Sequence, residues 1–285
     1  FVRVTAASDG DSLAAAGLLA RACADTATPF QLRLDDEAAV DTEDAVTVTV
    51  GPTAVDGDAA LDRPASPAAF AAARRLGADP DPVLALAGTI AAGETVQSAD
   101  TALDAAREAG RLDREPGLTL PTDDVPTGLA ASTLLHGPFS GDEDAAAALV
   151  AELGTGAADA HASGEDAGSG EEFDRRLASL VTVDTVTAEG ATDRAATAVE
   201  RAIRPHLTPD APFRTLGGYA DVLNAVARTA PAAGIPLGLG EGSDDARDAA
   251  VAAWRKHGAA VHAHLRSAAT RRHHGVWVLD CGDAD

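Results

Sequence analysis

A run of five β-branched residues, VTVTV at positions 46–50, restricts the fold more than any other stretch of this sequence. Val and Thr favour extended backbone, and Gly51 and Pro52 directly after the run end the strand that it predicts. Residues 2–6 alternate in the same way, and an Ala- and Leu-rich helical pattern follows from Leu13 to Ala24. The chain is therefore predicted to begin with a strand, a loop and a helix, and then to reach a second strand.

Helical patterns follow the second strand at Pro67 to Leu76, at Pro82 to Ala92 and over residues 100–112. Strands that alternate with helices are typical of a parallel sheet with helices packed on its faces. Sheets of this kind bind ligands at the carboxyl ends of their strands. We therefore expect an α/β fold built on a parallel sheet, with any functional site in the loops that follow the strands.

The regular alternation stops after residue 112. A turn-rich segment begins at Glu115, a helical pattern covers Asp142 to Leu153, and Gly154 to Glu172 is an acidic stretch of small residues that predicts a flexible loop. A second structured unit is expected to begin near Phe173. The predicted organisation is a parallel-sheet α/β domain at 1–112, a connector with the acidic loop at 113–172, and a smaller α/β domain at 173–285.

Helices and strands are also predicted within this second unit. Helical patterns cover Thr192 to Ile203, Gly218 to Thr229 and Asp244 to Thr270. The apolar run from Ile235 to Leu239, closed by a glycine, predicts a strand, and Val276 to Leu279 predicts a short terminal strand. The second unit is therefore expected to be α/β as well.

The charge of the chain indicates an adaptation to solvent. The formal net charge is −23 at pH 7, and arginine carries nearly all of the positive charge because Lys256 is the only lysine. In molar salt, exposed carboxylates keep a protein soluble while screening over roughly 3 Å weakens their repulsion. The acidity therefore does not exclude nucleic-acid binding, for which a local arginine cluster would be the signal. No stretch approaches the ~20 apolar residues of a membrane span, so we expect a cytoplasmic protein with no membrane partner.

Four stretches, taken in their order along the chain, resemble the archaeal RecJ-like branch of the DHH phosphoesterases, which includes the GINS-associated nucleases. The resemblance implies a parallel-sheet DHH-type N-terminal domain and a smaller α/β DHHA1-type C-terminal domain. The four stretches are Val2 to Ala20 with the loop TAASDG, Ser66 to Gly93, Pro116 to Asp142, and Gly217 to Arg228 with the following IPLGLG.

Active members of this family hold two Mn²⁺ or Mg²⁺ ions at the strand ends, and the ions activate a water molecule and bind the scissile phosphate. Their first motif is HxDxDG, and here Thr5 and Ala7 stand at the positions of its His and its first Asp. Only Asp9 and Gly10 remain of that motif. Because Thr and Ala are poor ligands for a divalent cation, the resemblance implies a fold without its usual first ligands.

The other metal-binding motifs are also reduced. Residues 49–52 lack the second Asp, no DHH triplet occurs, residues 61–63 (LDR) are its nearest remnant, and residues 91–94 (AAGE) occupy the fourth acidic position. We therefore expect no catalytic residue and no bound metal or cofactor. The remnant candidates are Asp9, Asp11 and Asp62, with Asp9 as a weak candidate ligand for a single cation.

Asp9 and Asp11 also have a simpler interpretation. The segment Ser8 to Ser12 (SDGDS) precedes a helical pattern, and Asp side chains at such positions accept hydrogen bonds from backbone N–H groups. The two aspartates are then turn and helix-capping residues. Their carboxylates would stabilise the fold and take no part in chemistry.

One predicted phosphate-binding element is the stretch that resembles the accessory domain. Gly217, Gly218, Asn224 and Arg228 match the substrate-facing element of that domain. A glycine turn at a helix start can meet a phosphate group. The alternative is an ordinary capped helix with no ligand.

A second candidate for phosphate contact lies near the end of the chain. Arg271 and Arg272 form a local basic patch in the neighbourhood of Lys256, although such charges are usually only solvated. A histidine cluster lies nearby: His257, His262 and His264 are on a predicted helix, and His273 and His274 follow it. His257 and His264 share one face of that helix, but no HExxH pattern or acidic partner accompanies them. We interpret these histidines as packed or polar side chains and not as zinc ligands.

The sequence supports two functional hypotheses. In the first, the protein is a catalytically degenerate RecJ-like subunit that binds single-stranded nucleic acid or acts as a scaffold for a GINS-like replisome component or an active RecJ or RNase subunit. In the second, it is an active exonuclease or phosphodiesterase that uses Mn²⁺ or Mg²⁺ bound by rearranged carboxylates. The loss of motifs favours the first hypothesis.

Overall fold

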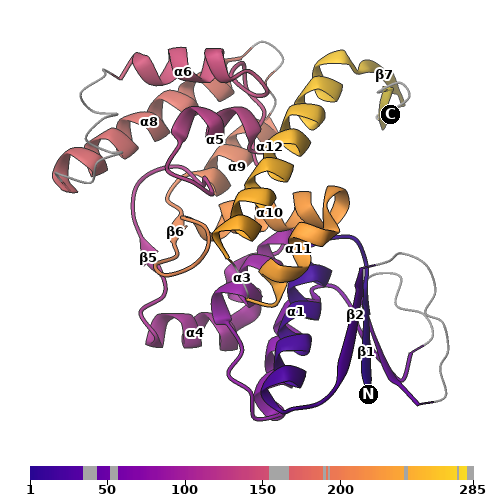
Figure 1. Cartoon of the computed structure of the whole chain (residues 1–285). Helices are drawn as coiled ribbons and strands as arrows, with labels where there is room; N and C mark the ends of the chain where they lie inside the picture. Colours follow the sequence, from indigo (N-terminus) through magenta and orange to yellow (C-terminus); the bar gives the residue numbers. More distant parts are fainter. Residues whose placement is uncertain are drawn as a thin grey trace. The chain divides into compact units, whose positions relative to one another are not determined.

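The computed structural model of this chain describes residues 1–34, 44–51, 57–153, 167–188, 191, 193–240, 243–274 and 276–280 (Figure 1). The backbone groups into two compact units, each made of two separate segments. Unit 1 comprises Phe1–Asp123 and Arg201–Trp254, and unit 2 comprises Asp124–Glu200 and Arg255–Asp285. The domain limits predicted after residues 112 and 172 do not coincide with these limits, because unit 1 is assembled by contacts between segments far apart in the sequence.

Unit 1 contains the predicted parallel sheet. Its strands are β1 (Val2–Ala6), β2 (Phe30–Leu34), β3 (Val46–Val50) and β4 (Ala59–Leu61), in the order β2-β1-β3-β4. All neighbouring strands run parallel. The α/β prediction and the two strands expected at β1 and β3 are therefore confirmed, while β2 and β4 were not predicted.

The helices of unit 1 pack around α1 (Gly10–Asp25), which lies against one face of the sheet (Figure 1). Alanine and glycine supply half of the residues of α1. Because their side chains are small, neighbouring helices can approach closely, and most residues of α1 are buried. A Cβ atom on Gly17 would overlap the backbone of Gly238. The helices in contact with α1 are α2 (Ala65–Arg75), α3 (Pro82–Ala91), α10 (Leu216–Thr229) and α11 (Pro231–Gly238).

Residues 235–239 form no strand, so that prediction was wrong. They belong mostly to α11, a short helix that begins with Pro231 in its first turn and contains Pro236. Proline in the first turn favours a helix because it has no backbone N–H and the N–H groups of this turn have no partner within the helix. An apolar run of this length fits a buried helix as well as a buried strand, and only the close contact with α1 distinguishes the two.

Unit 1 is completed by several smaller elements. A turn of 3₁₀ helix, η1 (Val96–Ala99), leads into α4 (Asp100–Glu108), and β5 (Asp113–Arg114) pairs antiparallel with β6 (His206–Leu207). The first turns of α12 (Asp244–Ser267) also belong to this unit. No helix in the described part of the chain is both long and apolar enough to cross a membrane.

Unit 2 is mainly helical. It contains α5 (Val125–Ala131), α6 (Glu143–Ala151), α8 (Ala167–Thr187), most of α9 (Asp193–Ala202) and the end of α12. An antiparallel hairpin of β7 (Ala269–His273) and β8 (Val276–Asp280) follows α12, which confirms the predicted terminal strand. Of the predicted acidic loop, residues 154–166 lie outside the described residues, and residues 167–172 begin α8 and are therefore helical.

Candidate functional site

The candidate site suggested by the sequence is the edge of the sheet at the carboxyl ends of β1 and β3. These strands are neighbours in the centre of the sheet, with Thr5 opposite Thr49 in the register. Directly beyond them, the Ala7 N–H donates to the Val50 carbonyl oxygen at 2.9 Å. A Cβ atom on Gly51 would lie 2.7 Å from the Ala7 Cβ and 2.6 Å from a serine hydroxyl. Small side chains and backbone groups are therefore closely packed around the ends of these two strands.

Asp9 caps the N-terminus of α1. Its Oδ1 accepts hydrogen bonds from the backbone N–H groups of Asp11 at 3.1 Å and of Ser12 at 3.0 Å, and its Oδ2 accepts the Ser12 hydroxyl at 2.9 Å. The backbone of Asp9 is extended and its side chain is buried, as is usual for a capping residue that leads into a packed helix. The capping interpretation of Asp9 is confirmed.

Asp11 also caps a helix, but the helix is α2 and not the one to which Asp11 belongs. Its Oδ2 accepts the Ala65 N–H at 2.6 Å, and its Oδ1 accepts the N–H and the hydroxyl of Ser66 at 2.9 and 2.5 Å. The residue before α2 is Pro64, whose ring cannot cap the helix, so the fully buried Asp11 carboxylate supplies this function from a distance in sequence. Burial raises the pKa of Asp11, although the hydrogen bonds from Ser66 and Ala65 oppose the shift.

Asn224 joins three helices at the same edge. Its Oδ1 accepts the Gly10 N–H at the start of α1 at 3.1 Å, and its Nδ2 donates to the Ala91 carbonyl oxygen at the end of α3 at 3.3 Å. An Arg63 guanidinium N–H donates to the same carbonyl at 3.1 Å. The sequence predicted Asn224 as a phosphate-binding residue, and the structure places it beside Asp9 and Gly10 with its amide engaged on both sides.

Gly217 and Gly218 lie in the first turn of α10 and are buried. The Gly218 N–H donates to the Thr215 hydroxyl at 3.1 Å, which makes Thr215 the cap of this helix. A Cβ atom on Gly218 would overlap the backbone of Leu120 and Pro121. The glycines thus lie in a closely packed, capped helix, as the simpler interpretation predicted, and the Gly218 N–H is used by the cap.

The remaining candidates are exposed where the structure describes them. Asp62 is exposed after β4, and Arg228 is exposed near the end of α10, where it donates to the Asn224 carbonyl oxygen at 3.2 Å. Arg271 is an exposed residue of β7 in unit 2, and the side chain of Arg272 lies outside the described residues. Within unit 1, the structure therefore brings together Asp9, Asp11 and Asn224 from the predicted set.

The donor groups at the sheet edge do not converge. Across the described residues, no group of three or more His, Cys, Asp or Glu side chains has an arrangement that could hold a metal ion. The oxygens of Asp9 and Asp11 accept hydrogen bonds from two different helix starts. At this edge, the side chains of Asp9, Asp11 and Asn224 stabilise the start of α1, the start of α2 and the end of α3. The carboxylate oxygens are therefore used in hydrogen bonds within the fold.

The histidine cluster predicted on α12 is a packed polar face. In unit 2, His262 is buried, its Nε2 lies 2.9 Å from the Ser132 carbonyl oxygen, and its Nδ1 lies 3.0 Å from the Nδ1 of His136. Burial and the nearby Arg266 lower the pKa of His136. Because the Ser132 carbonyl requires a proton on His262 Nε2, the neutral pair places the shared proton on His136. The two rings therefore fasten a loop to α12.

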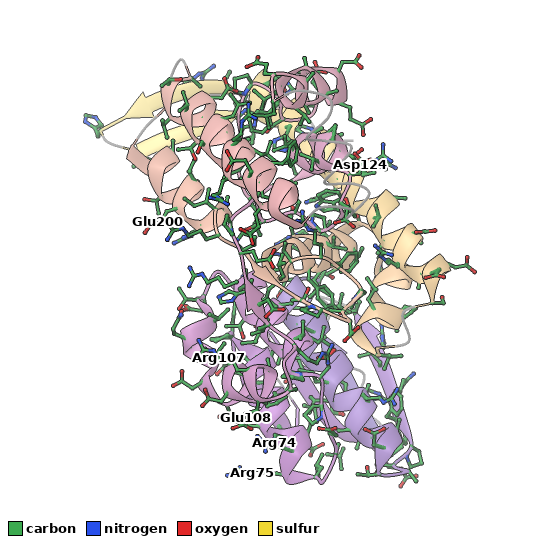
Figure 2. All side chains as sticks on the ribbon, turned by 90° about the vertical axis from the view of Figure 1, so that its left-hand side faces the viewer. Arg74, Arg75, Arg107, Glu108, Asp124 and Glu200 are labelled. Atoms are coloured by element: carbon green, nitrogen blue, oxygen red, sulfur yellow. The ribbon has the colours of Figure 1, made fainter. Side chains whose placement is uncertain are left out.

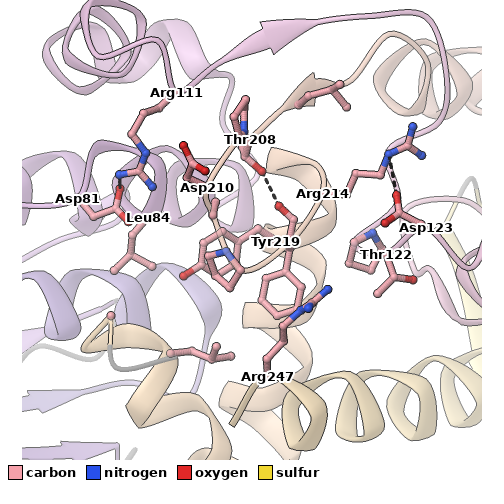
Figure 3. A pocket seen from close by; sticks show the side chains of 18 of the residues that line it. Asp81, Leu84, Arg111, Thr122, Asp123, Thr208, Asp210, Arg214, Tyr219 and Arg247 are labelled. Atoms are coloured by element: carbon pink, nitrogen blue, oxygen red, sulfur yellow. Dashed lines mark hydrogen bonds and ion pairs between the residues drawn. The ribbon is translucent and has the colours of Figure 1, made fainter. Parts of the chain in front are cut away.

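Sequence reasoning missed a hollow elsewhere in unit 1 (Figure 3). Three arginines line it, Arg111, Arg214 and Arg247, from three segments that are far apart in the sequence. No local motif links these segments. The sequence offered one indirect indication. In a chain of net charge −23, arginines that gather in one place indicate a candidate site for a negatively charged ligand.

The fold and the sheet edge define an α/β protein whose strand-end carboxylates cap helices. Over 287 aligned residues, the chain is 45% identical to a protein of Haloarcula marismortui named "Uncharacterized protein rrnAC1427", and the match covers all of this chain and 72% of the relative. The chain belongs to the same family as this haloarchaeal protein, whose source agrees with the salt adaptation expected from composition. No protein-family model matches the chain.

Proposed function

We propose that this protein is a RecJ-like relative of the DHH phosphoesterases that has lost metal-dependent hydrolysis and acts as a nucleic-acid-binding or scaffold subunit of a replication, repair or nuclease complex. The four ordered sequence stretches and the parallel sheet support the family assignment. The observation that carries the proposed loss of catalysis is the use of both surviving carboxylates, Asp9 and Asp11, as helix caps.

A two-metal phosphoesterase needs several deprotonated carboxylates and imidazoles that point at the same ions. Here Thr5 and Ala7 replace two of those ligands, and Asp11 is fully buried against the start of α2. To bind a cation, Asp9 would have to give up hydrogen bonds that hold the start of α1. Each such bond to a charged group contributes about 1.5–3 kcal/mol, so ligation and capping compete.

The proposed partners are single-stranded nucleic acid, a GINS-like replisome component, or an active RecJ or RNase subunit. The net charge of −23 opposes binding to a polyanion at low salt. At molar salt, the screening length falls to roughly 3 Å, so only arginines in direct contact with the ligand matter. Binding assays therefore belong in molar KCl, and a scaffold role through protein contacts remains compatible with weak nucleic-acid affinity.

The test uses the full chain in molar KCl with Mn²⁺ and labelled single-stranded oligonucleotides. We expect retention of the oligonucleotide or co-purification with replisome or nuclease subunits from the native host, with no Mn²⁺-dependent release of mononucleotides. Release that requires Mn²⁺, that Asp9→Ala abolishes and that the exposed α4 variant Asp104→Ala preserves would establish the exonuclease alternative. A monodisperse protein that binds neither partner nor oligonucleotide would contradict the proposed binding role.

A further inference from the structure

The hollow of unit 1 has a volume of about 650 Å³ and lies away from the sheet edge (Figure 3). Its walls include Asp81 and Leu84 at the start of α3, whereas the sheet edge contacts Ala91 at the end of that helix. Ten helical residues separate these ends by about 15 Å. The hollow is within the range of roughly 300–1,000 Å³ that is usual for small-molecule sites.

Two of its three arginines have donor groups that the protein leaves unused. The Arg111 guanidinium pairs with Asp81 at 3.0 Å, but its Nε is buried without a hydrogen-bond partner among the described residues. Arg247 is exposed, and no ion pair of its guanidinium is found within the described part of the chain. The third, Arg214, pairs at 3.3 Å with Asp123, whose side chain is 74% exposed. Buried donors without partners in a native structure indicate a missing water molecule or ligand.

The wall also carries the carboxylates of Asp81, Asp123, Asp210 and Asp244, of which Asp81 and Asp123 pair with Arg111 and Arg214. Two further features of the wall favour a negatively charged ligand. The helices α3, α10 and α12 all begin at the hollow, and helix starts carry partial positive charge. Tyr219 of α10 lines the hollow, and burial together with the nearby Asp81 raises the pKa of its hydroxyl. The phenol therefore stays protonated at neutral pH and keeps an O–H group that can donate a hydrogen bond.

Part of the wall is apolar. Leu84, Leu207, Leu237 and Phe213 contribute to it together with three prolines, Pro121, Pro209 and Pro212. An inorganic anion has no apolar part, so it would make no contact with these apolar side chains. A ligand with an apolar or aromatic body and a charged end uses both parts of the wall.

We infer that this hollow binds a phosphorylated small molecule about the size of a mononucleotide, with its phosphate at the guanidinium groups of Arg247 and Arg111 and its body against the apolar part of the wall. A phosphate has three acceptor oxygens, which suits donors that arrive from several elements better than the two oxygens of a carboxylate. The inference does not depend on the proposed function, because none of these residues lies at the sheet edge.

The test is equilibrium dialysis of the full chain in molar KCl with AMP, adenosine, inorganic phosphate and citrate as separate probes. We expect saturable binding of AMP that exceeds the binding of adenosine and of inorganic phosphate. Arg247→Gln should weaken AMP binding roughly tenfold or more, because it removes a charge-assisted hydrogen bond. Arg75→Gln is the matched control, since Arg75 is an exposed arginine at the end of α2 that lines no part of the hollow (Figure 2).

A second variant tests the volume without changing charge. Ala211→Phe places a ring in the hollow, and we expect it to weaken AMP binding while all arginines remain. Unchanged thermal unfolding of Arg247→Gln would show that lost binding is not lost folding. The inference is overturned if AMP does not bind saturably, if citrate binds as well as AMP, or if Arg75→Gln weakens binding as much as Arg247→Gln does.

Discussion

The sheet edge and the arginine-lined hollow lie in the same unit and differ in how their polar groups are used. At the sheet edge, Asp9, Asp11 and Asn224 make hydrogen bonds to backbone groups of α1, α2 and α3. In the hollow, Arg111 retains a buried donor without a partner among the described residues, and Arg247 is exposed. Polar side chains that satisfy backbone groups stabilise a fold, whereas an exposed guanidinium such as that of Arg247 is accessible to a ligand.

The comparison also shows why residue type alone is a weak indicator of activity. Asp9 and Gly10 fit the first motif of the proposed family, and both have structural partners at the start of α1. The strand ends beside them are closely packed, because a Cβ atom on Gly51 would lie 2.7 Å from the Ala7 Cβ. A motif residue is therefore a weak indicator of activity until its hydrogen-bond partners are known.

The largest expected effect comes from breaking the sheet edge with Asp11→Ala. The substitution leaves two backbone N–H groups and the Ser66 hydroxyl without their buried acceptor. We expect the free energy of unfolding to fall by about 4 kcal/mol, measured by denaturant titration in molar KCl. Asp62→Ala removes an exposed carboxylate as the control and should leave stability unchanged. Equal stability of the two variants would show that Asp11 does not hold α2.

A smaller effect is expected from Trp254→Phe, which acts on the hollow side of unit 1. The buried Trp254 Nε1–H donates to Asp221 at 2.8 Å and fastens α12 to α10, and both helices line the hollow. Phe keeps most of the packing but leaves the buried carboxylate one donor short, at a cost of about 2 kcal/mol. Calorimetric unfolding measures this loss. AMP binding should weaken as well. A variant that keeps the full AMP affinity would show that the Trp254–Asp221 hydrogen bond does not support the hollow.

Asn224→Ala should have a still smaller effect, confined to the sheet edge. It leaves the Gly10 N–H and the Ala91 carbonyl without their amide partner, although Arg63 continues to donate to Ala91. We expect a loss of about 1–2 kcal/mol in the free energy of unfolding. Dialysis with AMP should give the wild-type affinity. A large fall in AMP affinity would show that the edge and the hollow are one site.

The smallest expected effect is a pH dependence. Because burial raises the pKa of Asp11 above 3.8, the folded protein takes up this proton at a higher pH than the unfolded chain does. Protonation then favours folding, so the wild type should gain stability relative to Asp11→Asn as the pH falls through the folded-state pKa toward 3.8. Denaturant titrations of both proteins at several pH values measure the difference. A difference that is constant with pH would contradict the raised pKa.

Local patterns explain why part of the fold was predictable. The alternating residues of β1 and β3 and the Ala-rich α1 are strong signals, and the Asp9 cap follows from its place before that helix. The short strand β4 offers only Ala and Leu in mostly exposed positions, so periodicity could not detect it. The apolar α11 was mistaken for a strand because its length fits both.

The candidate site was less predictable because its partners are remote in sequence. The acceptor role of Asp11 depends on residues 54 and 55 positions away, and Asn224 reaches Gly10 across 214 positions. From the sequence alone, these side chains could be identified only as polar groups that lie near a helix start or on a helix. Only the packing of α1, α2, α3 and α10 shows that their hydrogen bonds are made within the protein.

The most direct test of the structural role of the sheet edge is a Mn²⁺ titration of the full chain in molar KCl, followed by electron paramagnetic resonance of the free ion. We expect the wild type and Asp9→Asn to leave the same amount of Mn²⁺ free at every concentration, because the Asp9 oxygens accept hydrogen bonds from the start of α1. One Mn²⁺ bound stoichiometrically by the wild type and lost in Asp9→Asn would contradict this role.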